Sequence, residues 1–429
     1  MIRHRPHTAR RSLALAVCLL SFVWVAALVW AESPAVWKAG AARVDITPEE
    51  LMWMAGYAAR KKPADGYAQN LYAKALALES EGGERLVVVT MDLIGVLPSL
   101  RDAVESQAEE KFGLAPAALV LNASHTHCGP EYRERRGREE EARRYHAMLD
   151  EKIVEVIGQA LARLEPAALS WAEARAGFAA NRRGGIGGGG GITLAGPVDH
   201  AVPVLRVDAA DGQLRAVLFG YACHNTTLSS VATIEGEPRY EFNGDYAGFA
   251  QQHLEKAHPE AVALFLSGCG ADQNPHPRRD MVPGIAPLEM AEHHGRTLFL
   301  AVEAVLNAPR RAIPGPIKSA FRDVEVLRKD GGSDARPFSY PVQVIQFGGE
   351  LALVALASEV VVDYSLRLKR EISARNIPAV WVAGYSNGYF GYIPSVRVLN
   401  EGGYEAGPWD ASIEERIVGA VHGLLDDLR

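Results

Sequence analysis

The sequence alternates short apolar runs, rich in β-branched residues, with longer segments in which apolar residues recur at helical spacing. The short runs predict buried strands, at residues 85–90, 118–123, 202–207, 214–222, 261–266, 342–347, 351–356 and 380–383. The helical segments lie at residues 100–112, 139–164, 288–306, 359–374 and 413–428. Strands and helices interleave along the chain, which predicts an α/β fold of mixed β-sheets flanked by helices.

Two pairs of the predicted strands are close enough in sequence to form hairpins. Asp211-Gly212 separates one pair and Gly348-Gly349 separates the other, and both dipeptides favour tight turns. With 429 residues the chain has room for two or three domains. No change in composition marks a boundary, so we expect residues 32–429 to form a single domain.

The N-terminus has the pattern of an export signal. Several arginines precede an apolar run from Leu13 to Ala31, and no acidic residue occurs before Glu32. Val29 and Ala31 are the small residues expected before a signal-peptidase cut. We therefore expect residues 1–31 to be a signal peptide. An uncleaved N-terminal anchor is the alternative, because the run approaches the roughly 20 residues that span a bilayer. Either reading predicts an exported chain, periplasmic or extracellular.

Charge and cysteine content exclude some classes of protein. The formal net charge of −7 leaves no basic surplus for binding phosphates, so we expect no nucleic-acid partner. Apart from Cys18, the chain has Cys128, Cys223 and Cys269, too few for a disulfide scaffold. Either two of them form a disulfide and the third is a free thiol, or all three are buried and pack as small hydrophobic side chains.

A glycine run is the only low-complexity segment. Residues 184–191 contain seven glycines in eight positions. No Lys-Ser or Lys-Thr pair follows and no helical pattern begins there, which excludes a phosphate-binding P-loop. The glycine run is then either a surface loop or a lid over the substrate.

Polar motifs follow several predicted strands, and the most specific of them contains two histidines. The segment N-A-S-H-T-H-C-G-P, residues 122–130, comes at the end of a buried strand. Residues i and i+2 of a strand lie on the same side, so His125 and His127 can face one point. Two neutral imidazoles placed in this way are half of a typical zinc site. Two polar loop histidines are the alternative.

Two further motifs carry residues that bind metals. His224 follows the strand at 214–222, within the segment Y-A-C-H-N-T-T. Ser358 and Glu359 follow the strand at 351–356. Ser358 is predicted to be the N-cap of the next helix. Glu359 is then either a metal ligand or a partner of the helix dipole.

The remaining two motifs are glycine-rich loops. Residues 266–275 include Asp272 and Asn274, and residues 384–392 include Tyr389 and Tyr392. In open sheets, ligands bind beyond the carboxyl ends of the strands. Five polar motifs at five such ends predict a metal site there.

These motifs resemble those of the neutral/alkaline non-lysosomal ceramidases, in their catalytic domain, from Gly40 to about Trp409. H-T-H-C-G-P at 125–130 is similar to the family's H-T-H-S-G-P, and N-G-D-Y-A-G at 243–248 also matches. C-H-N-T at 223–226 resembles its second histidine motif. S-E at 358–359 and S-N-G-Y at 386–389 resemble its P-G-E and S-N-x-Y.

The resemblance implies a site with one zinc ion per chain. The implied ligands are His125, His224, Glu359 and Tyr389. His127 would lie close by as a proton-transfer or orienting group. Such a site hydrolyses the amide of ceramide.

Further roles follow from the same resemblance. Asn181-Arg182 is similar to an N-R-S motif whose arginine contacts ligand, so we expect Arg182 to bind substrate, together with Tyr392. Asp272 and Asn274 are candidates for orienting water or substrate.

The sequence also departs from the family in two places. The family has a serine, proposed to be the nucleophile, in G-D-x-S-P-N, whereas residues 270–275 read G-A-D-Q-N-P. We therefore expect no serine nucleophile. Cys128, which replaces the family's serine in the histidine motif, is an alternative nucleophile. A C-terminal immunoglobulin-like domain is not expected after the last helix.

The predicted function is an exported zinc-dependent amidohydrolase that cleaves an N-acyl amide, such as a ceramide-like lipid, by metal-activated water. The expected partner is a small-molecule or lipid acyl-amide, and contact with a membrane surface would come through that substrate. The alternatives are a metal-dependent hydrolase of another ester or amide, and a non-catalytic exported binding protein that retains the fold.

Overall fold

The computed structural model describes Met1 and residues 37–184, 191–193, 196–228, 233–234, 237–278, 281–329 and 337–429. Contacts divide the chain into Met1–Ala35 and Val36–Arg429. The predicted signal peptide or anchor and most of the glycine run lie outside the described residues. No helix in the described ranges is long and apolar enough to cross a membrane.

The larger of the two main sheets has nine strands, in the order β14-β10-β9-β6-β1-β3-β4-β5, with β16 paired to β6. The strands are β1 Trp37–Asp45, β3 Tyr72–Ser80, β4 Arg85–Met91, β5 Leu119–Ala123, β6 Glu165–Arg175, β9 Ala201–Ala209, β10 Leu214–Tyr221, β14 Val262–Ser267 and β16 Arg311–Ala312. β9 and β10 form the predicted hairpin. β10 pairs in parallel with β14, and β4 with β5, so the carboxyl ends of each pair lie at the same edge.

The smaller main sheet has the order β17-β18-β19-β21. Its strands are β17 Ile317–Val326, β18 Phe338–Phe347, β19 Leu351–Leu356 and β21 Ala379–Ala383. β18 and β19 form the second predicted hairpin, and β19 runs parallel to β21. Shorter strands are β2 Gly66–Tyr67, β7 Ala179–Gly184, β8 Gly191–Thr193, β11 Thr233–Ile234, β12 Glu237–Pro238, β13 Glu241–Phe242, β15 Gln273–Pro275, β20 Glu359–Val360 and β22 Tyr392–Ile393.

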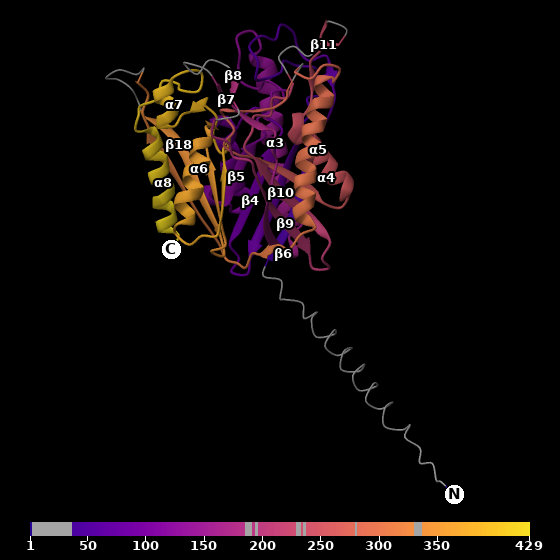
Figure 1. Ribbon diagram of the computed structural model, residues 1–429, viewed down its shortest axis with the longest axis vertical. Helices are drawn as coiled ribbons and strands as arrows, with labels where there is room; N and C mark the ends of the chain where they lie inside the picture. The colour runs from indigo at the N-terminus through magenta and orange to yellow at the C-terminus, as the bar shows by residue number, and fades with distance from the viewer. Residues whose placement is uncertain are drawn as a thin grey trace. The chain divides into compact units, whose positions relative to one another are not determined.

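Helices cover both sheets (Figure 1), with α6 and α8 beside the smaller one and α4 and α5 together against the larger. They are α2 Pro98–Phe112, α3 Glu139–Ala162, α4 Asp245–Ala257, α5 Pro287–Leu306, α6 Val362–Ser373, α7 Val396–Glu401 and α8 Ile413–Asp427, with a 3₁₀ turn at Pro116–Ala118. In α3, Leu149, Ile153 and Ile157 recur at helical spacing and are buried in one core cluster with Val87 and Val89 of β4. This packing holds α3 against the larger sheet, mainly over β1 and β3.

One buried side chain joins the ends of the strands. The Asn122 amide of β5 donates to the Gly384 carbonyl, just after β21, at 2.7 Å. Its oxygen accepts from the Ser267 N–H, at the end of β14, at 3.0 Å. Single bridges also link Asn122 to Ser386 and Gly268 to Ala383. The two edge strands of the larger sheet therefore meet the smaller sheet at one point.

The predicted α/β fold of mixed sheets flanked by helices is confirmed, but the start of one helix is wrong. The helix predicted at 359–374 begins at Val362, and its N-cap is Val361. Ser358 does not cap it, because Ser358 has a φ of 67° and Glu359 pairs with Tyr392 in a short parallel ladder. Glu359 therefore lies outside the helix, and the helix-dipole reading of its role is wrong.

Candidate metal centre

Three buried histidines gather at the strand ends. His125 and His127 follow β5, and His224 follows β10. One ring nitrogen from each lies within 4.8 Å of the others, and the Nε2 atoms of His125 and His127 are 3.1 Å apart. The sequence thus identified both histidine motifs, and the fold brings them together.

Glu359 and Tyr389, which follow β19 and β21 of the smaller sheet, complete this cluster. Glu359 Oε2 lies 3.3 Å from His125 Nε2 and 3.2 Å from His224 Nε2. The Tyr389 hydroxyl donates to Glu359 Oε1 at 3.0 Å. The four residues predicted as ligands are thus in one cluster, with His127 beside them.

Backbone carbonyls fix the orientation of two of the rings. His125 Nδ1 lies 2.6 Å from the Ile94 carbonyl, and His224 Nδ1 lies 2.7 Å from the Gly270 carbonyl. A carbonyl only accepts hydrogen bonds, so each Nδ1 carries the proton and each Nε2 presents a lone pair to the cluster. Among the described residues, His224 Nε2 and Glu359 Oε2 have no hydrogen-bond partner. Buried acceptors left without a donor are costly, and a cation bound between them removes that cost.

The protonation states also suit a cation. Burial lowers the pKa of His224 to about 4, and burial and the neighbouring histidines hold the pKa of His127 well below its usual value. Metal ligands must be deprotonated, and the lowered pKa of His224 keeps its ring neutral at neutral pH. The cluster can therefore hold a metal ion.

The backbone around the cluster is strained. Four non-glycine residues just after strands have a left-handed φ: 59° at His125, 67° at Ser358, 50° at Tyr385 and 56° at Asn387. Each costs free energy and persists only where the surroundings impose it. Here the Asn387 side chain accepts from the Leu121 N–H at 2.8 Å, and the Tyr385 N–H donates to the Ser358 carbonyl at 2.9 Å. Tyr385 also stacks on the His125 ring, with 4.4 Å between centroids. It belongs to the 384–392 motif but was not singled out in the sequence.

The cluster borders two cavities. One, of about 540 Å³, is lined by His127, Glu359, Tyr389 and Tyr392 together with a set of arginines. The other, of about 230 Å³, is lined by His127, Tyr392, Arg182 and Asn274. His127 and Tyr392 thus border both spaces, and a ligand in either cavity would lie beside the histidines.

The predicted substrate residues lie around the smaller cavity. Arg182 pairs with Glu405 at 2.7 Å and donates to the Tyr392 hydroxyl at 3.2 Å. The side-chain oxygen of Asn274 is buried and has no hydrogen-bond partner among the described residues. Asn274 therefore offers a free acceptor next to the histidine cluster.

Asp272 holds the loops together. Its buried carboxylate accepts from the Val362 N–H at 2.9 Å, from the Gln273 side chain at 3.0 Å and from the Asn181 side chain at 3.1 Å. These contacts tie the loop after β14 to β7 and to the start of α6. They give Asp272 a positioning role, and its predicted action on water or substrate stays a prediction.

The cysteines are not catalytic candidates. Cys128, Cys223 and Cys269 are buried and free, so the alternative of one disulfide bridge is wrong. Burial raises the pKa of the Cys128 thiol to about 12. A thiol that stays protonated is a poor nucleophile, which argues against the catalytic reading of Cys128.

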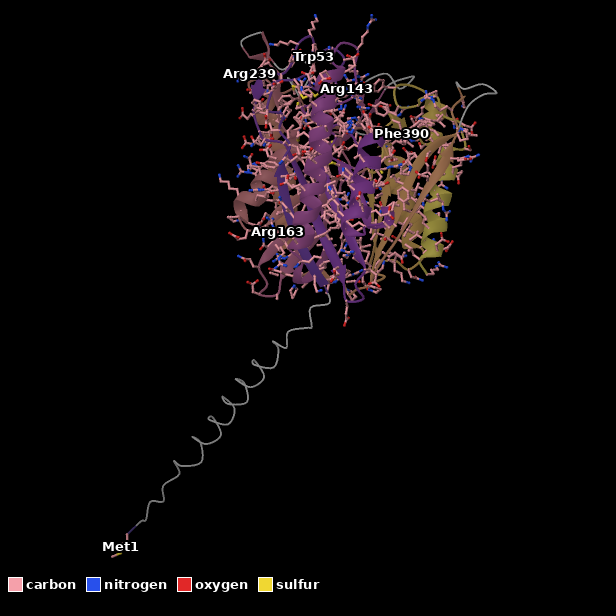
Figure 2. All side chains as sticks on the ribbon, turned by 180° about the vertical axis from the view of Figure 1, so that it is seen from behind. Met1, Trp53, Arg143, Arg163, Arg239 and Phe390 are labelled. Carbon is pink, nitrogen blue, oxygen red and sulfur yellow. The ribbon has the colours of Figure 1, made fainter. Side chains whose placement is uncertain are left out.

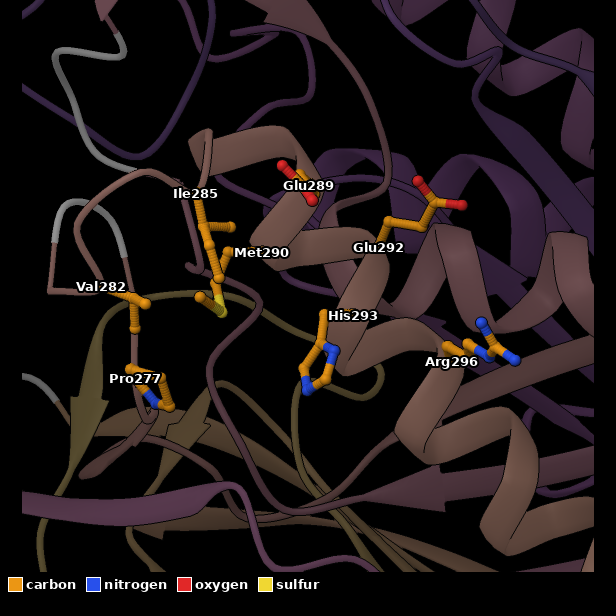
Figure 3. Close-up of a pocket in the computed structure, with 8 residues that line it drawn as sticks. All are labelled: Pro277, Val282, Ile285, Glu289, Met290, Glu292, His293 and Arg296. Carbon is orange, nitrogen blue, oxygen red and sulfur yellow. The ribbon is translucent and has the colours of Figure 1, made fainter.

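A separate cavity of about 340 Å³ lies along the start of α5 (Figure 3). Its lining includes Pro277, Met290, His293 and Arg296. None of the predicted site residues lines it, so it is not part of this centre.

Comparisons with known proteins agree with this geometry. The sequence profile of the neutral/alkaline non-lysosomal ceramidases, N-terminal, matches residues 37–273. The crystal structure of neutral ceramidase from Pseudomonas aeruginosa matches with a TM-score of 0.77 at 20% identity, over 92% of this chain and 75% of that one. A structure described as ceramidase complexed with C2 matches with a TM-score of 0.75 at 20% identity, over 92% and 76%. No curated protein matches. The chain belongs to the neutral/alkaline non-lysosomal ceramidase family.

Proposed function

We propose that the protein is an exported, zinc-dependent amidohydrolase that cleaves the N-acyl amide of a ceramide-like lipid. Family membership supports hydrolysis of an amide. The observation that carries the proposal is the meeting of His125, His224, Glu359 and Tyr389 at one buried point.

The donor set suits zinc. Nitrogen and oxygen ligands lie about 2.0–2.2 Å from zinc, so two ligands of a tetrahedral site lie roughly 3.3 Å apart. The distances of 3.3 Å and 3.2 Å from Glu359 Oε2 to the two histidine nitrogens match this value. Imidazole and carboxylate groups are usual ligands of zinc. His125, His224, Glu359 and Tyr389 would hold the ion.

When bound, zinc supplies a Lewis acid that polarises a carbonyl oxygen and lowers the pKa of water. In the overall reaction water adds to the amide carbon, the carbon–nitrogen bond breaks, and the nitrogen leaves as an amine with the proton. His127 is neutral and borders both cavities. It can accept the proton from water and return it to the leaving nitrogen.

The chemistry proposed here does not use a serine. Gln273 and Asn274 stand in the segment where the family has its serine motif, and a side-chain amide is no nucleophile. The free oxygen of Asn274 instead accepts a hydrogen bond, which suits a substrate N–H or hydroxyl group. Arg182 and Tyr392 would hold the same part of the substrate.

Elemental analysis of the purified protein, followed by a screen of N-acyl lipids, tests the proposal. We expect one zinc per chain and hydrolysis that a chelator abolishes. Zinc with turnover of esters only would favour another metal-dependent hydrolase. Absence of both metal and turnover would favour a binding protein. An N-terminus beginning at Glu32, measured on secreted protein, would support export with cleavage.

A further inference from the structure

The larger of the two cavities at the metal centre has a strongly basic wall, which the sequence analysis did not single out. Five arginines line this cavity, against the two carboxylates of Glu131 and Glu359. We call these arginines the arginine wall, and they are Arg60, Arg133, Arg135, Arg136 and Arg138. The segment R-E-R-R-G-R at 133–138 supplies four of them, immediately after the first histidine motif.

The carboxylate of Glu131 is the counter-ion of two of the five arginines. Arg133 binds Glu131 with two nitrogens, each at 2.6 Å. Arg135 lies 3.5 Å from the same carboxylate. No carboxylate of the described chain lies within 4.0 Å of Arg60, Arg136 or Arg138. The wall therefore keeps an excess of positive charge.

Of these three arginines, Arg60 gives the strongest argument for a bound anion, because it is buried. Only 7% of it is exposed, and it donates to the carbonyls of Ala55 and His127. Its Nε has no partner among the described residues. A guanidinium stays charged in proteins. It lies over the Tyr57 and Tyr240 rings, but no carboxylate neutralises it, and a buried cation without a counter-charge is costly. An anion in the cavity would remove that cost.

Arg138 is held in a defined orientation. Its guanidinium stacks on the Trp53 ring at 3.2 Å from the centroid. Stacking restricts the plane of the guanidinium while its N–H groups stay free to donate, and this geometry suits bidentate binding of an oxyanion. Trp53 lies at the end of the molecule where α3 begins, as Figure 2 shows by the labels Trp53 and Arg143.

On the basis of the proposed function, we propose that the arginine wall binds an anionic group of the substrate, a carboxylate, sulfonate or phosphate. The substrate class is then an N-acyl amide that carries a negative charge, whose anion lies against the wall while its amide reaches His127 and Glu359. The same cavity is lined by both groups, so one small amphiphile can contact both.

Calorimetry with two matched amides, each in the form of an uncleavable ketone analogue with a methylene group in place of the amide N–H, tests this proposal independently of turnover. N-lauroyltaurine and N-lauroylethanolamine share the chain and the amide, and only the first bears a sulfonate. Both are titrated as monomers. We expect the holoenzyme to bind the sulfonate at least about tenfold more tightly at low salt, because a partly desolvated ion pair is worth more than that factor. The preference should weaken as salt rises.

Substitutions assign the preference to the wall. Arg136→Gln together with Arg138→Gln should reduce the ratio of affinities at least about threefold, and Arg60 accounts for the preference that remains. Arg143→Gln is the matched control, because Arg143 is half-exposed, pairs with Glu134 and Glu140, and does not line the cavity. The control should keep the full preference.

Equal affinity for the two amides in the wild-type protein would overturn the proposal, as would an equal loss in the control. An anionic bilayer is the other source of negative charge. Tighter binding to phosphatidylglycerol than to phosphatidylcholine vesicles, without a preference for the sulfonate monomer, would assign the wall to a membrane surface and overturn the substrate assignment. Hydrolysis of both amides with equal affinity refutes only this inference. A sulfonate preference without hydrolysis of either refutes only the proposed function.

Discussion

Gly95 leaves the space that Tyr389 needs, and filling it should disable the metal centre. A Cβ added at Gly95 would lie 2.3 Å from Tyr389 Cγ and 2.7 Å from Tyr389 Cβ. Ordinary carbon contacts are about 3.5–4.0 Å, so the ring must retreat by about 1 Å or more. The hydroxyl of Tyr389 is now 3.0 Å from Glu359 Oε1, and a shift of this size breaks the hydrogen bond. Gly95 does not have a left-handed φ, so Gly95→Ala adds no backbone strain.

A misplacement of about 1 Å costs roughly 100-fold in rate, and loss of a supporting group costs roughly 10–100-fold in metal affinity. We expect Gly95→Ala to reduce kcat/KM on an N-acyl amide about 100-fold and to weaken zinc binding at least about tenfold, measured by competition with a chelator. Gly177→Ala is the control, since a Cβ there meets nothing within 4 Å.

A second variant distinguishes damage to the metal centre from unfolding of the Gly95→Ala protein. Tyr389→Phe removes the hydroxyl without adding volume, and should weaken zinc binding in the same way with Tm nearly unchanged. Normal zinc affinity and normal kcat/KM in folded Gly95→Ala would refute the reasoning, because Tyr389 would then not depend on this space or the site would not depend on Tyr389.

Three other predictions address the metal, the nucleophile and pH. His125→Ala with His224→Ala should lose zinc in elemental analysis, whereas His258→Ala, whose ring pairs with Glu303, should retain it; stoichiometric zinc in the double variant would contradict the ligand assignment. A serine-directed fluorophosphonate should leave activity unchanged, and a chelator should abolish it until zinc is restored. Stoichiometric labelling of a serine with loss of activity would exclude this mechanism. Burial raises the pKa of Glu105 from 4.5 to about 7. The folded state thus favours the protonated form, and the resulting stability is complete below about pH 4.5 and is lost as pH rises through about 7. Glu105→Gln should reduce the drop in Tm between about pH 5 and pH 8.5, and an unchanged drop would show that another group causes it.

The strands that could be predicted from the sequence are those with β-branched runs, such as β4 and β19. β1, β3 and β6 were not predicted. Their sequences are rich in alanine, as in A-K-A-L-A-L-E-S of β3, and alanine does not favour strands. These strands lie next to one another in the middle of the larger sheet. Their structure comes from pairing with neighbours that are distant in sequence, which local patterns do not contain.

The site was partly predictable for a similar reason. Position after a strand indicated that the motifs containing His125, His224 and Tyr389 meet, and the family resemblance named these residues as ligands. Position also suggested Glu359, but local propensity placed it in a helix, because Ser-Glu is a common helix start. Pairing of β20 with β22 overrides that preference. The charge of the arginine wall was present as R-E-R-R-G-R, but only the fold shows that it faces the metal centre.

The two main sheets contribute different ligands, and this links the centre to their docking. His125 and His224 follow strands of the larger sheet, whereas Glu359 and Tyr389 follow strands of the smaller one. Without a cation, the cluster brings lone pairs and a carboxylate together with no donor for His224 Nε2 or Glu359 Oε2, which disfavours the docked arrangement. Asn122 favours the docked arrangement, because its side chain donates to the Gly384 carbonyl after β21 of the smaller sheet and accepts from the Ser267 N–H of the larger sheet. A ligand that binds only the docked state stabilises it in proportion to its affinity. Metal affinity and the docking of the two sheets must therefore rise and fall together, and Asn122, although it is not a ligand, contributes to both.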